Sequence, residues 1–230
     1  MGLKNLKYIF LITVDCLRKD YSSPILKTLI RKISQPFILF KNHYTNGPNT
    51  ANSFPAMFTS MPLLLHNSLS VNPQGRTIAY FMKMGKFSTI GINSNPLLLC
   101  IDGLFNNFDK VLHLWSDTKL VNRSDFLKNV KRNAVTLIPK SMAINPIIYK
   151  RIIMPITLFY QTLATCGQYG IDSAPQRPYA SGETVTNAAV QEIKNLLEKG
   201  VEKFFMWIHY MDTHAPYVAP ESYIRDVCSY

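Results

Sequence analysis

Short, continuous apolar runs alternate along the chain with stretches in which apolar residues recur at helical spacing. The run from Tyr8 to Val14 contains aromatic and β-branched residues and is too short to cross a membrane. Such a run predicts a strand that is buried on both faces of a sheet. Similar runs predict further strands at Phe87 to Ile92 and Phe204 to Ile208, and a short strand at Phe37 to Phe40.

The first helix is predicted directly after the first strand. Ser22 and Ser23 precede Pro24, an order typical of a helix start with a hydroxyl cap and a proline in the first turn. Apolar residues continue at helical spacing as far as Ile33, with basic residues on the other face. Pro36 then predicts the end of this helix.

Three more helices are predicted further along the chain. The segment from Thr50 to Ser60 begins with several possible capping residues, and Pro55 would have to lie in its first turn. Arg76 to Met84 is followed by Gly85, a C-cap residue, and Thr184 to Leu197 has a clear apolar face.

Strands that alternate with helices predict βαβ units, and therefore an α/β fold with a mainly parallel central sheet and helices on both faces. Residues 93–108 read as a loop. From about 115 to 180, charges and prolines interrupt short apolar runs, so this stretch is interpreted as a less regular insertion in a single domain of residues 1–230.

Composition narrows the classes of function. The formal net charge is +11, but the basic residues are scattered and no finger or RNP spacing occurs, so we expect no nucleic-acid binding. The four cysteines are far apart and lack metal-ligand spacing, and the N-terminus lacks a signal-peptide cleavage site. Both observations favour a cytoplasmic protein. Residues 140–165 are basic and apolar but interrupted, which leaves peripheral membrane contact open.

Polar clusters follow three of the predicted elements: Asp15 after the first strand, residues 50–53 at a helix start, and residues 209–214 after the last strand. In a parallel sheet the first and third clusters would emerge at the same edge. A carboxylate-bound divalent metal can activate a hydroxyl at a helix N-terminus as a nucleophile, and histidines can bind the substrate anion or move a proton. This combination is typical of phosphoryl or sulfuryl transfer.

Structural roles remain alternatives for each cluster. Asp15 could cap the following turn, Thr50 could be a plain N-cap, and His209 could be a histidine at the edge of the core that bonds to backbone. His214 lies in a polar, proline-flanked segment, which favours function.

Three segments, in this order, resemble the sulfatase branch of the alkaline-phosphatase-like superfamily: LITVDCLRKD, NGPNTANSFPAMFTSMP and WIHYMDTHAPYVAP. The resemblance implies a metal-dependent hydrolase or transferase that acts on a small anionic sulfate or phosphate ester. It also implies a divalent ion (Ca, Mn, Mg or Zn) bound by Asp15 and by the nucleophile, with His214 and His209 contacting the anion.

Two alignments of the second segment compete for the nucleophile. Aligning the helix tail places Thr50 in this position, whereas aligning a Ser-Phe-Pro start places Ser53 there and leaves the helix three residues short. We favour Thr50. It would then contribute both to catalysis and, together with Asp15, to metal binding.

Several residues differ from the sulfatase pattern, and these differences change which substrate is expected. Phe54 stands where sulfatases have an arginine, residues 91–95 replace a Lys- and His-containing segment, and Cys16 replaces a possible carboxylate. These changes favour relatives that use a threonine on phosphodiesters, such as phosphoglycerol transferases. A late Asp-His pair expected for the metal is absent before Tyr230. The chain is therefore interpreted as C-terminally incomplete. The alternative is that it is a non-catalytic remnant of the family or an anion-binding module. The sequence does not predict the oligomeric state.

Overall fold

The computed structural model describes residues 6–33, 36–62, 71, 76–115, 119–120, 179–215 and 217. Strands and helices alternate along these residues, as predicted for an α/β fold. Their order is β1 (Tyr8–Val14), α1 (Lys19–Lys32), α2 (Thr50–Thr59), α3 (Ile78–Met84), β2 (Ser88–Asn93), the 3-10 helix η3 (Pro96–Cys100), β3 (Lys110–Trp115), β4 (Lys119–Leu120), α7 (Gly182–Glu198) and β5 (Phe204–Tyr210).

The sheet has the strand order β1-β5-β2-β3-β4. β5 pairs in parallel with β1 and with β2, β2 pairs in parallel with β3, and only β4 is antiparallel. His209 of β5 lies opposite Thr13 on one side and Asn93 on the other. The carboxyl ends of β1, β5 and β2 therefore lie side by side, which confirms the predicted parallel sheet.

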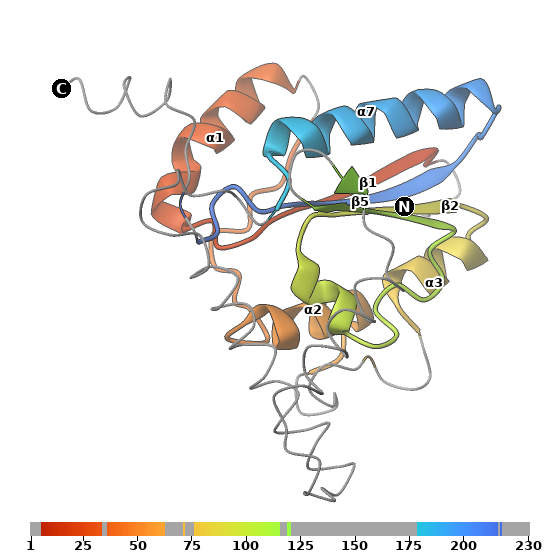
Figure 1. Ribbon diagram of the computed structural model, residues 1–230. Helices are drawn as coiled ribbons and strands as arrows, with labels where there is room; N and C mark the ends of the chain where they lie inside the picture. The colour runs from red at the N-terminus through yellow and green to blue at the C-terminus, as the bar shows by residue number, and fades with distance from the viewer. Residues whose placement is uncertain are drawn as a thin grey trace, which may run out of the picture.

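Helices cover both faces of the sheet, as predicted: α7 lies on one face, and α2, α3 and η3 lie on the other (Figure 1). β5 is the strand that both layers share. Phe205 and Trp207 point into the core beneath α2 and η3, whereas Phe204, Met206 and Ile208 point toward α7. A continuous apolar run is required at β5 because each side chain enters one of the two cores.

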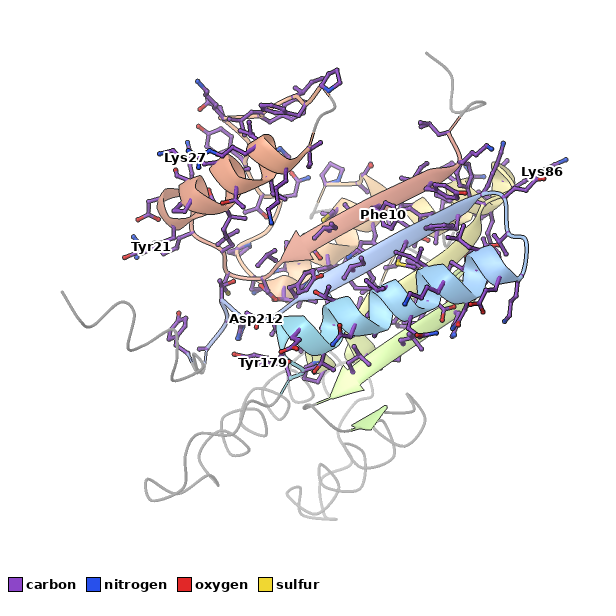
Figure 2. All side chains as sticks on the ribbon, turned by 90° about the horizontal axis from the view of Figure 1, so that it is seen from above. Phe10, Tyr21, Lys27, Lys86, Tyr179 and Asp212 are labelled. Atoms are coloured by element: carbon purple, nitrogen blue, oxygen red, sulfur yellow. The ribbon has the colours of Figure 1, made fainter. Side chains whose placement is uncertain are left out.

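The prediction that β1 is buried on both faces is wrong. β1 has the predicted bounds, but it lies at the edge of the described sheet and its burial alternates. Ile9 and Leu11 pack on the core beneath α2, while Phe10 and Ile12, on the opposite face, remain 45% and 58% exposed. α7 covers β5 and β2 but leaves this face of β1 open, as the position of Phe10 shows (Figure 2).

Several predicted strands and loops also need correction. Residues 37–40 form no strand, because no neighbouring strand pairs with them among the described residues. β3 and β4 were not predicted, and η3 forms inside the predicted loop 93–108. Most of the expected insertion at 115–180 lies outside the described residues. The single-domain assignment therefore stays a prediction.

The predicted helices exist, but α1, α3 and α7 begin two or three residues away from their predicted starts, and only α2 begins at the predicted residue, Thr50. α1 starts three residues before Ser22, so Pro24 lies inside the helix and the Ser22 hydroxyl donates to the carbonyl of Lys19. Pro55 likewise lies in the second turn of α2 rather than the first. Pro55 lacks the N–H that would bond four residues back, and a proline is tolerated there at the cost of that one bond. α3 starts at Ile78 and α7 spans the predicted segment.

α1 stands to one side of the sheet, with Tyr21 and Lys27 directed outward (Figure 2). None of its residues is buried. Among the described helices, none is both long enough and apolar enough to cross a bilayer. Residues 140–165, for which membrane contact was left open, lie outside the described residues.

Candidate active site

Asp15 follows β1 at the carboxyl edge of the sheet, and two bonds fix its backbone to the segment after β5. Its N–H donates to the carbonyl of Tyr210 at 2.9 Å, and the hydroxyl of Thr213 donates to the Asp15 carbonyl at 2.5 Å. The backbone of the next residue, Cys16, adopts a left-handed conformation with φ 57°. The chain turns sharply here, so the Asp15 side chain stays at the strand end.

Thr50 is the first residue of α2 and contacts the Asp15 side chain. Its hydroxyl donates to Asp15 Oδ2 across 3.4 Å, a long hydrogen bond. The capping role belongs instead to Asn49, whose side chain accepts from the N–H of Asn52. Because Asn49 caps the helix, the Thr50 hydroxyl is left to face the carboxylate.

Ser53, the other nucleophile candidate, lies at the end of the first turn of α2 and is half-buried. The described contact with the Asp15 side chain comes from Thr50 and not from Ser53. Phe54, where the resemblance placed an arginine, is buried and packs edge-on against Trp207 and His209. This position therefore supplies an apolar wall rather than a positive charge.

His209 is fully enclosed at the end of β5, with 0% of its surface exposed. Nδ1 lies 2.9 Å from the hydroxyl oxygen of Thr13. Nε2 lies 3.6 Å from Asp15 Oδ2 and has no hydrogen-bond partner among the described residues. We expected His209 to contact the substrate anion, and this stays a prediction; in the structure the ring is enclosed and its Nε2 faces the carboxylate of Asp15.

His214 lies in the turn after β5 and is half-buried. Its Nδ1 is 2.6 Å from the carbonyl of Ala215. A carbonyl only accepts, so Nδ1 carries the proton and Nε2 is left to take up or release one. The turn is held by the hydroxyl of Tyr179, which donates to the His214 carbonyl at 2.5 Å.

Asp212, between the two histidines, has a structural contact. Its Oδ1 accepts from the N–H of Gly182 at the start of α7, 2.9 Å away. A Cβ built on Gly182 would lie 2.7 Å from Asp212 Oδ2, so a larger residue at position 182 would displace the Asp212 carboxylate. Figure 2 shows Asp212 beside the first turn of α7. This contact ties the segment after β5 to the helix that covers it.

Asn95 is a site residue that the sequence did not reveal. Its Nδ2 donates to Asp15 Oδ2 at 3.0 Å, and its Oδ1 accepts from the N–H of Leu97 in η3 at 2.9 Å. The bond to Leu97 fixes which end of the amide is oxygen, so the amino end must face Asp15. The signal for this residue was Asn95-Pro96, an N-cap followed by proline, inside a stretch read as a loop.

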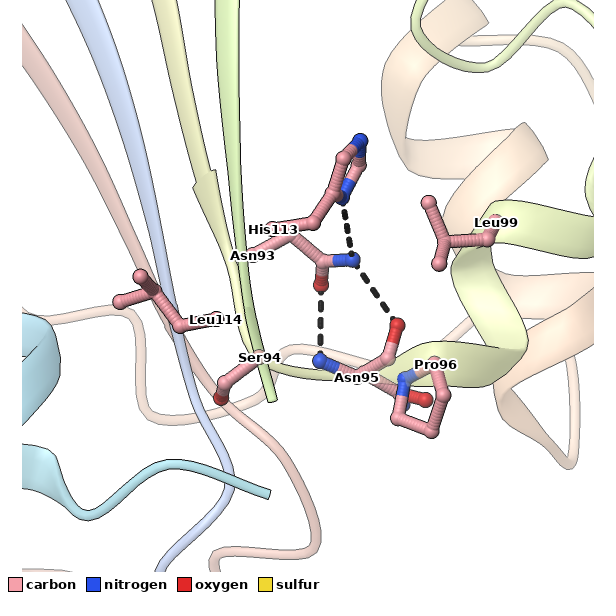
Figure 3. A pocket seen from close by; sticks show the side chains of 7 residues that line it. All are labelled: Asn93, Ser94, Asn95, Pro96, Leu99, His113 and Leu114. Atoms are coloured by element: carbon pink, nitrogen blue, oxygen red, sulfur yellow. Dashed lines mark hydrogen bonds between the residues drawn. The ribbon is translucent and has the colours of Figure 1, made fainter. Parts of the chain in front are cut away.

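Asn93 anchors the Asn95 backbone on both sides. Asn93 Oδ1 accepts from the N–H of Asn95 at 2.9 Å, and Asn93 Nδ2 donates to its carbonyl at 2.8 Å and lies 3.4 Å from His113 Nδ1 (Figure 3). The hydroxyl of Ser94 donates to the His209 carbonyl at 3.2 Å. The end of β2 is therefore a rigid support for the amide that holds Asp15.

The charge state of Asp15 follows from its neighbours. Burial raises the pKa of the Asp15 carboxyl. The hydrogen bond and charge of His209 lower this pKa, and the charge of His214 and the hydrogen bond from the Cys16 thiol lower it to a smaller extent. The net pKa is below the ordinary value of 3.8. Burial and the Asp15 charge raise the pKa of the Cys16 thiol. Asp15 is thus a carboxylate at neutral pH.

The described residues fit a divalent ion in part. No group of three or more His, Cys, Asp and Glu side chains converges among them. Asp15, the Thr50 hydroxyl and the unpartnered Nε2 of His209 do meet at one carboxylate oxygen. Carboxylate, hydroxyl and imidazole are accepted metal ligands. These three residues would therefore hold an ion from one side.

Comparison with protein-family models matches residues 7–230 to the family described as Sulfatase. The chain belongs to the sulfatase family. Searches of curated proteins and of solved structures found no match. Family membership confirms the resemblance and the alkaline-phosphatase-like α/β fold, and it supports a hydrolytic function on sulfate or phosphate esters. Members of the sulfatase family generally use a divalent metal ion.

Proposed function

We propose that this sulfatase-family chain is a metal-dependent hydrolase or transferase of sulfate or phosphate esters that uses Thr50 as its nucleophile. The observation that carries the proposal is the contact between the Thr50 hydroxyl, at the N-terminus of α2, and the carboxylate of Asp15. The two groups are 35 positions apart in sequence and meet only because β1 ends where α2 begins.

The proposed reaction is a displacement at sulfur or phosphorus. Thr50 Oγ1 forms the new bond, the bond to the ester oxygen breaks, and the hydroxyl proton has Asp15 Oδ2 as its first acceptor. A divalent ion held by Asp15 and Thr50 would make the hydroxyl easier to deprotonate and would offset the negative charge of the substrate.

The departing alcohol needs a proton, and we assign its donation to His214. Its Nδ1–H is committed to the carbonyl of Ala215, so Nε2 is the atom that donates to the leaving oxygen. Water, or an acceptor alcohol in a transferase, then attacks the sulfur or phosphorus of the ester on Thr50 and loses its proton to His214. The bond to Thr50 Oγ1 breaks, the sulfate or phosphate product leaves, and Thr50 regains its proton from Asp15. The helix N-terminus beside Thr50 offers backbone N–H groups to the anion throughout.

Among the described residues, the side chains that bond to or pair with the Asp15 carboxylate are those of Cys16, Thr50, Asn95 and His209, and none of them is a lysine or an arginine. With Phe54 in place of the arginine, the site is better matched to an ester with a single negative charge than to a doubly charged phosphomonoester. Sulfate monoesters and phosphodiesters carry one charge, so we propose these as the substrate class.

The test compares hydrolysis of nitrophenyl sulfate, nitrophenyl phosphate and bis-nitrophenyl phosphate with added Zn²⁺, Mn²⁺ or Ca²⁺. Thr50→Ala should lower kcat/KM by about 10³-fold or more, the scale of losing a nucleophile, whereas Ser53→Ala should stay within about threefold. Equal activity of the wild type and Thr50→Ala on all three esters would refute Thr50 as the nucleophile. A loss confined to Ser53→Ala would move the assignment to Ser53.

A further inference from the structure

The buried Nε2 atom of His209 lacks a hydrogen-bond partner among the described residues. The ring is held firmly: Phe54 packs on it edge-on with ring centroids 4.9 Å apart, and Trp207 stacks on it at 5.7 Å. A buried polar atom without a partner is costly, and in native structures such an atom calls for an explanation. It faces Oδ2 of Asp15, which lies 3.6 Å away.

The Thr13 hydroxyl settles which ring nitrogen carries the proton. Thr13 Oγ1 lies 3.0 Å from Trp207 Nε1, 2.9 Å from His209 Nδ1 and 3.4 Å from the carbonyl of Ile208. The indole only donates and the carbonyl only accepts. All three contacts are satisfied together only if Nδ1–H of His209 donates to Thr13 and the Thr13 hydroxyl donates to Ile208.

With the ring neutral, as a metal-binding imidazole must be, this arrangement directs the lone pair of Nε2 at the carboxylate of Asp15. Two electron-rich groups at this distance repel each other unless a positive charge lies between them. Two ligand atoms that are each about 2.1 Å from one ion lie roughly 3.4–3.6 Å apart when the angle at the ion is about 110–120°. The observed separation of 3.6 Å between Nε2 and Oδ2 falls in this range.

We propose that His209 is a metal ligand through Nε2 and that it shares with Asp15 an ion of the Zn²⁺ class. The inference rests on the proposed function for Asp15 and Thr50 and adds a nitrogen ligand to their oxygen ligands. An imidazole ligand favours Zn²⁺ and other transition ions over Ca²⁺ and Mg²⁺, which prefer all-oxygen sets. The structure thereby narrows the identity of the ion.

Thr13 and Asn95 act on the ion through its ligands. Thr13 holds the proton on Nδ1 and so keeps Nε2 free to coordinate, and Asn95 fixes Oδ2 of Asp15. Partners of this kind tune affinity by about 10–100-fold. They are positioning residues, and Thr13 offers a matched pair of substitutions: Thr13→Val keeps the β-branched shape and removes the hydroxyl, while Thr13→Ser keeps the hydroxyl.

The test titrates metal-free protein with Zn²⁺ and with Mg²⁺ by calorimetry. The wild type should bind Zn²⁺ at least about 100-fold more tightly than Mg²⁺. His209→Gln should lose most of this preference, and Thr13→Val should weaken Zn²⁺ binding by about 10–100-fold while Thr13→Ser stays within about threefold. His43→Gln, at an exposed histidine that is not among the residues bonded to the Asp15 carboxylate, should bind as the wild type does.

Nitrogen-15 NMR of His209 gives a readout that does not depend on variant folding. With Zn²⁺ present, the proton should sit on Nδ1 and the Nε2 resonance should shift on coordination; a proton on Nε2 in the Zn²⁺-loaded wild type would overturn the proposal. If Asp15→Asn abolishes Zn²⁺ binding and His209→Gln does not, His209 is no ligand, and the proposed function stands. If the wild type binds no divalent ion, both proposals fail.

Discussion

Two carboxylates, at opposite ends of the sheet, have opposite surroundings. Asp109 precedes β3 at the amino end, where it accepts from the N–H of Thr89 at 2.8 Å and pairs with Nζ of Lys83 at 2.7 Å. Asp15 follows β1 at the carboxyl end, where its donors are a neutral hydroxyl and a neutral amide and its nearest imidazole nitrogen has no partner.

The difference separates a structural carboxylate from a candidate catalytic one. Asp109 has the Lys83 cation at Oδ1 and both the N–H and the hydroxyl of Thr89 at Oδ2, so both of its oxygens are satisfied by groups of the fold itself. Asp15 has an incomplete set that a positive ion would complete. Depressed pKa values occur at both residues, so the direction of the shift alone does not distinguish the two roles.

The largest expected effect is on catalytic activity, which should depend on Asp15 and not on Asp109. Asp15→Asn should lower kcat/KM for ester hydrolysis by about 10³-fold or more, because an amide holds a divalent ion poorly. Asp109→Asn should leave kcat/KM within about threefold. Steady-state assays of both variants at the metal concentration that just saturates the wild type would test this, and equal losses in both would show that the two carboxylates do not differ in role.

An intermediate effect is expected at Asn95, which supports one of the two carboxylates. Asn95→Ala removes the donor to Asp15 Oδ2 and the cap of η3, and kcat/KM should fall by about 10–100-fold. Asn187→Ala, at an exposed position of α7, is the control and should have wild-type kinetics. Unchanged kinetics of Asn95→Ala would remove Asn95 from the site.

A smaller effect is expected on the free energy of unfolding, where Asp109→Asn should cost more than Asp15→Asn. Asp109→Asn should lower the free energy of unfolding by about 1–2 kcal/mol, since it weakens charge-assisted hydrogen bonds at a half-exposed site. Asp15→Asn should change it by less than about 1 kcal/mol. Urea unfolding monitored by tryptophan fluorescence measures both values. A larger loss for Asp15→Asn than for Asp109→Asn would contradict the assignment of roles.

The smallest effect is the acid dependence of this stability. Burial raises the pKa of the Asp109 carboxyl, and the hydrogen bonds and charge of Lys83 and Thr89 lower it, with a net pKa below 3.8. A depressed pKa contributes stability above the ordinary value and loses it as pH falls through the folded pKa. The stability difference between the wild type and Asp109→Asn should therefore be constant above pH 5 and shrink on acidification below 3.8; a constant difference throughout would exclude this linkage.

The apolar pattern predicted the strands better than their places in the sheet. The runs in β1 and β5 look alike in sequence, yet β5 is buried on both faces and β1 alternates at an edge. Burial depends on which strands become neighbours, and that order arises from contacts distant in sequence. The run at 37–40 has the same composition and forms no strand, because pairing rather than propensity defines one.

The candidate site was predictable where residue type alone signals chemistry. Asp15, Thr50 and His209 were named from the ends of their elements, and the structure brings all three together. Asn95 and Thr13 were missed, because a single amide or hydroxyl has many structural uses and its role depends on one partner across the sheet. His214 was named, but its carbonyl-bound Nδ1 could only be found from the geometry.

In the proposed reaction, Asp15 is the residue that makes Thr50 reactive. The most direct measurement is mass spectrometry of the protein quenched during turnover of nitrophenyl sulfate or bis-nitrophenyl phosphate with Zn²⁺. A sulfuryl or phosphoryl adduct should appear on Thr50 in the wild type and should be absent in Asp15→Asn. An adduct on any other residue, or turnover by Asp15→Asn at the wild-type rate, would contradict the account.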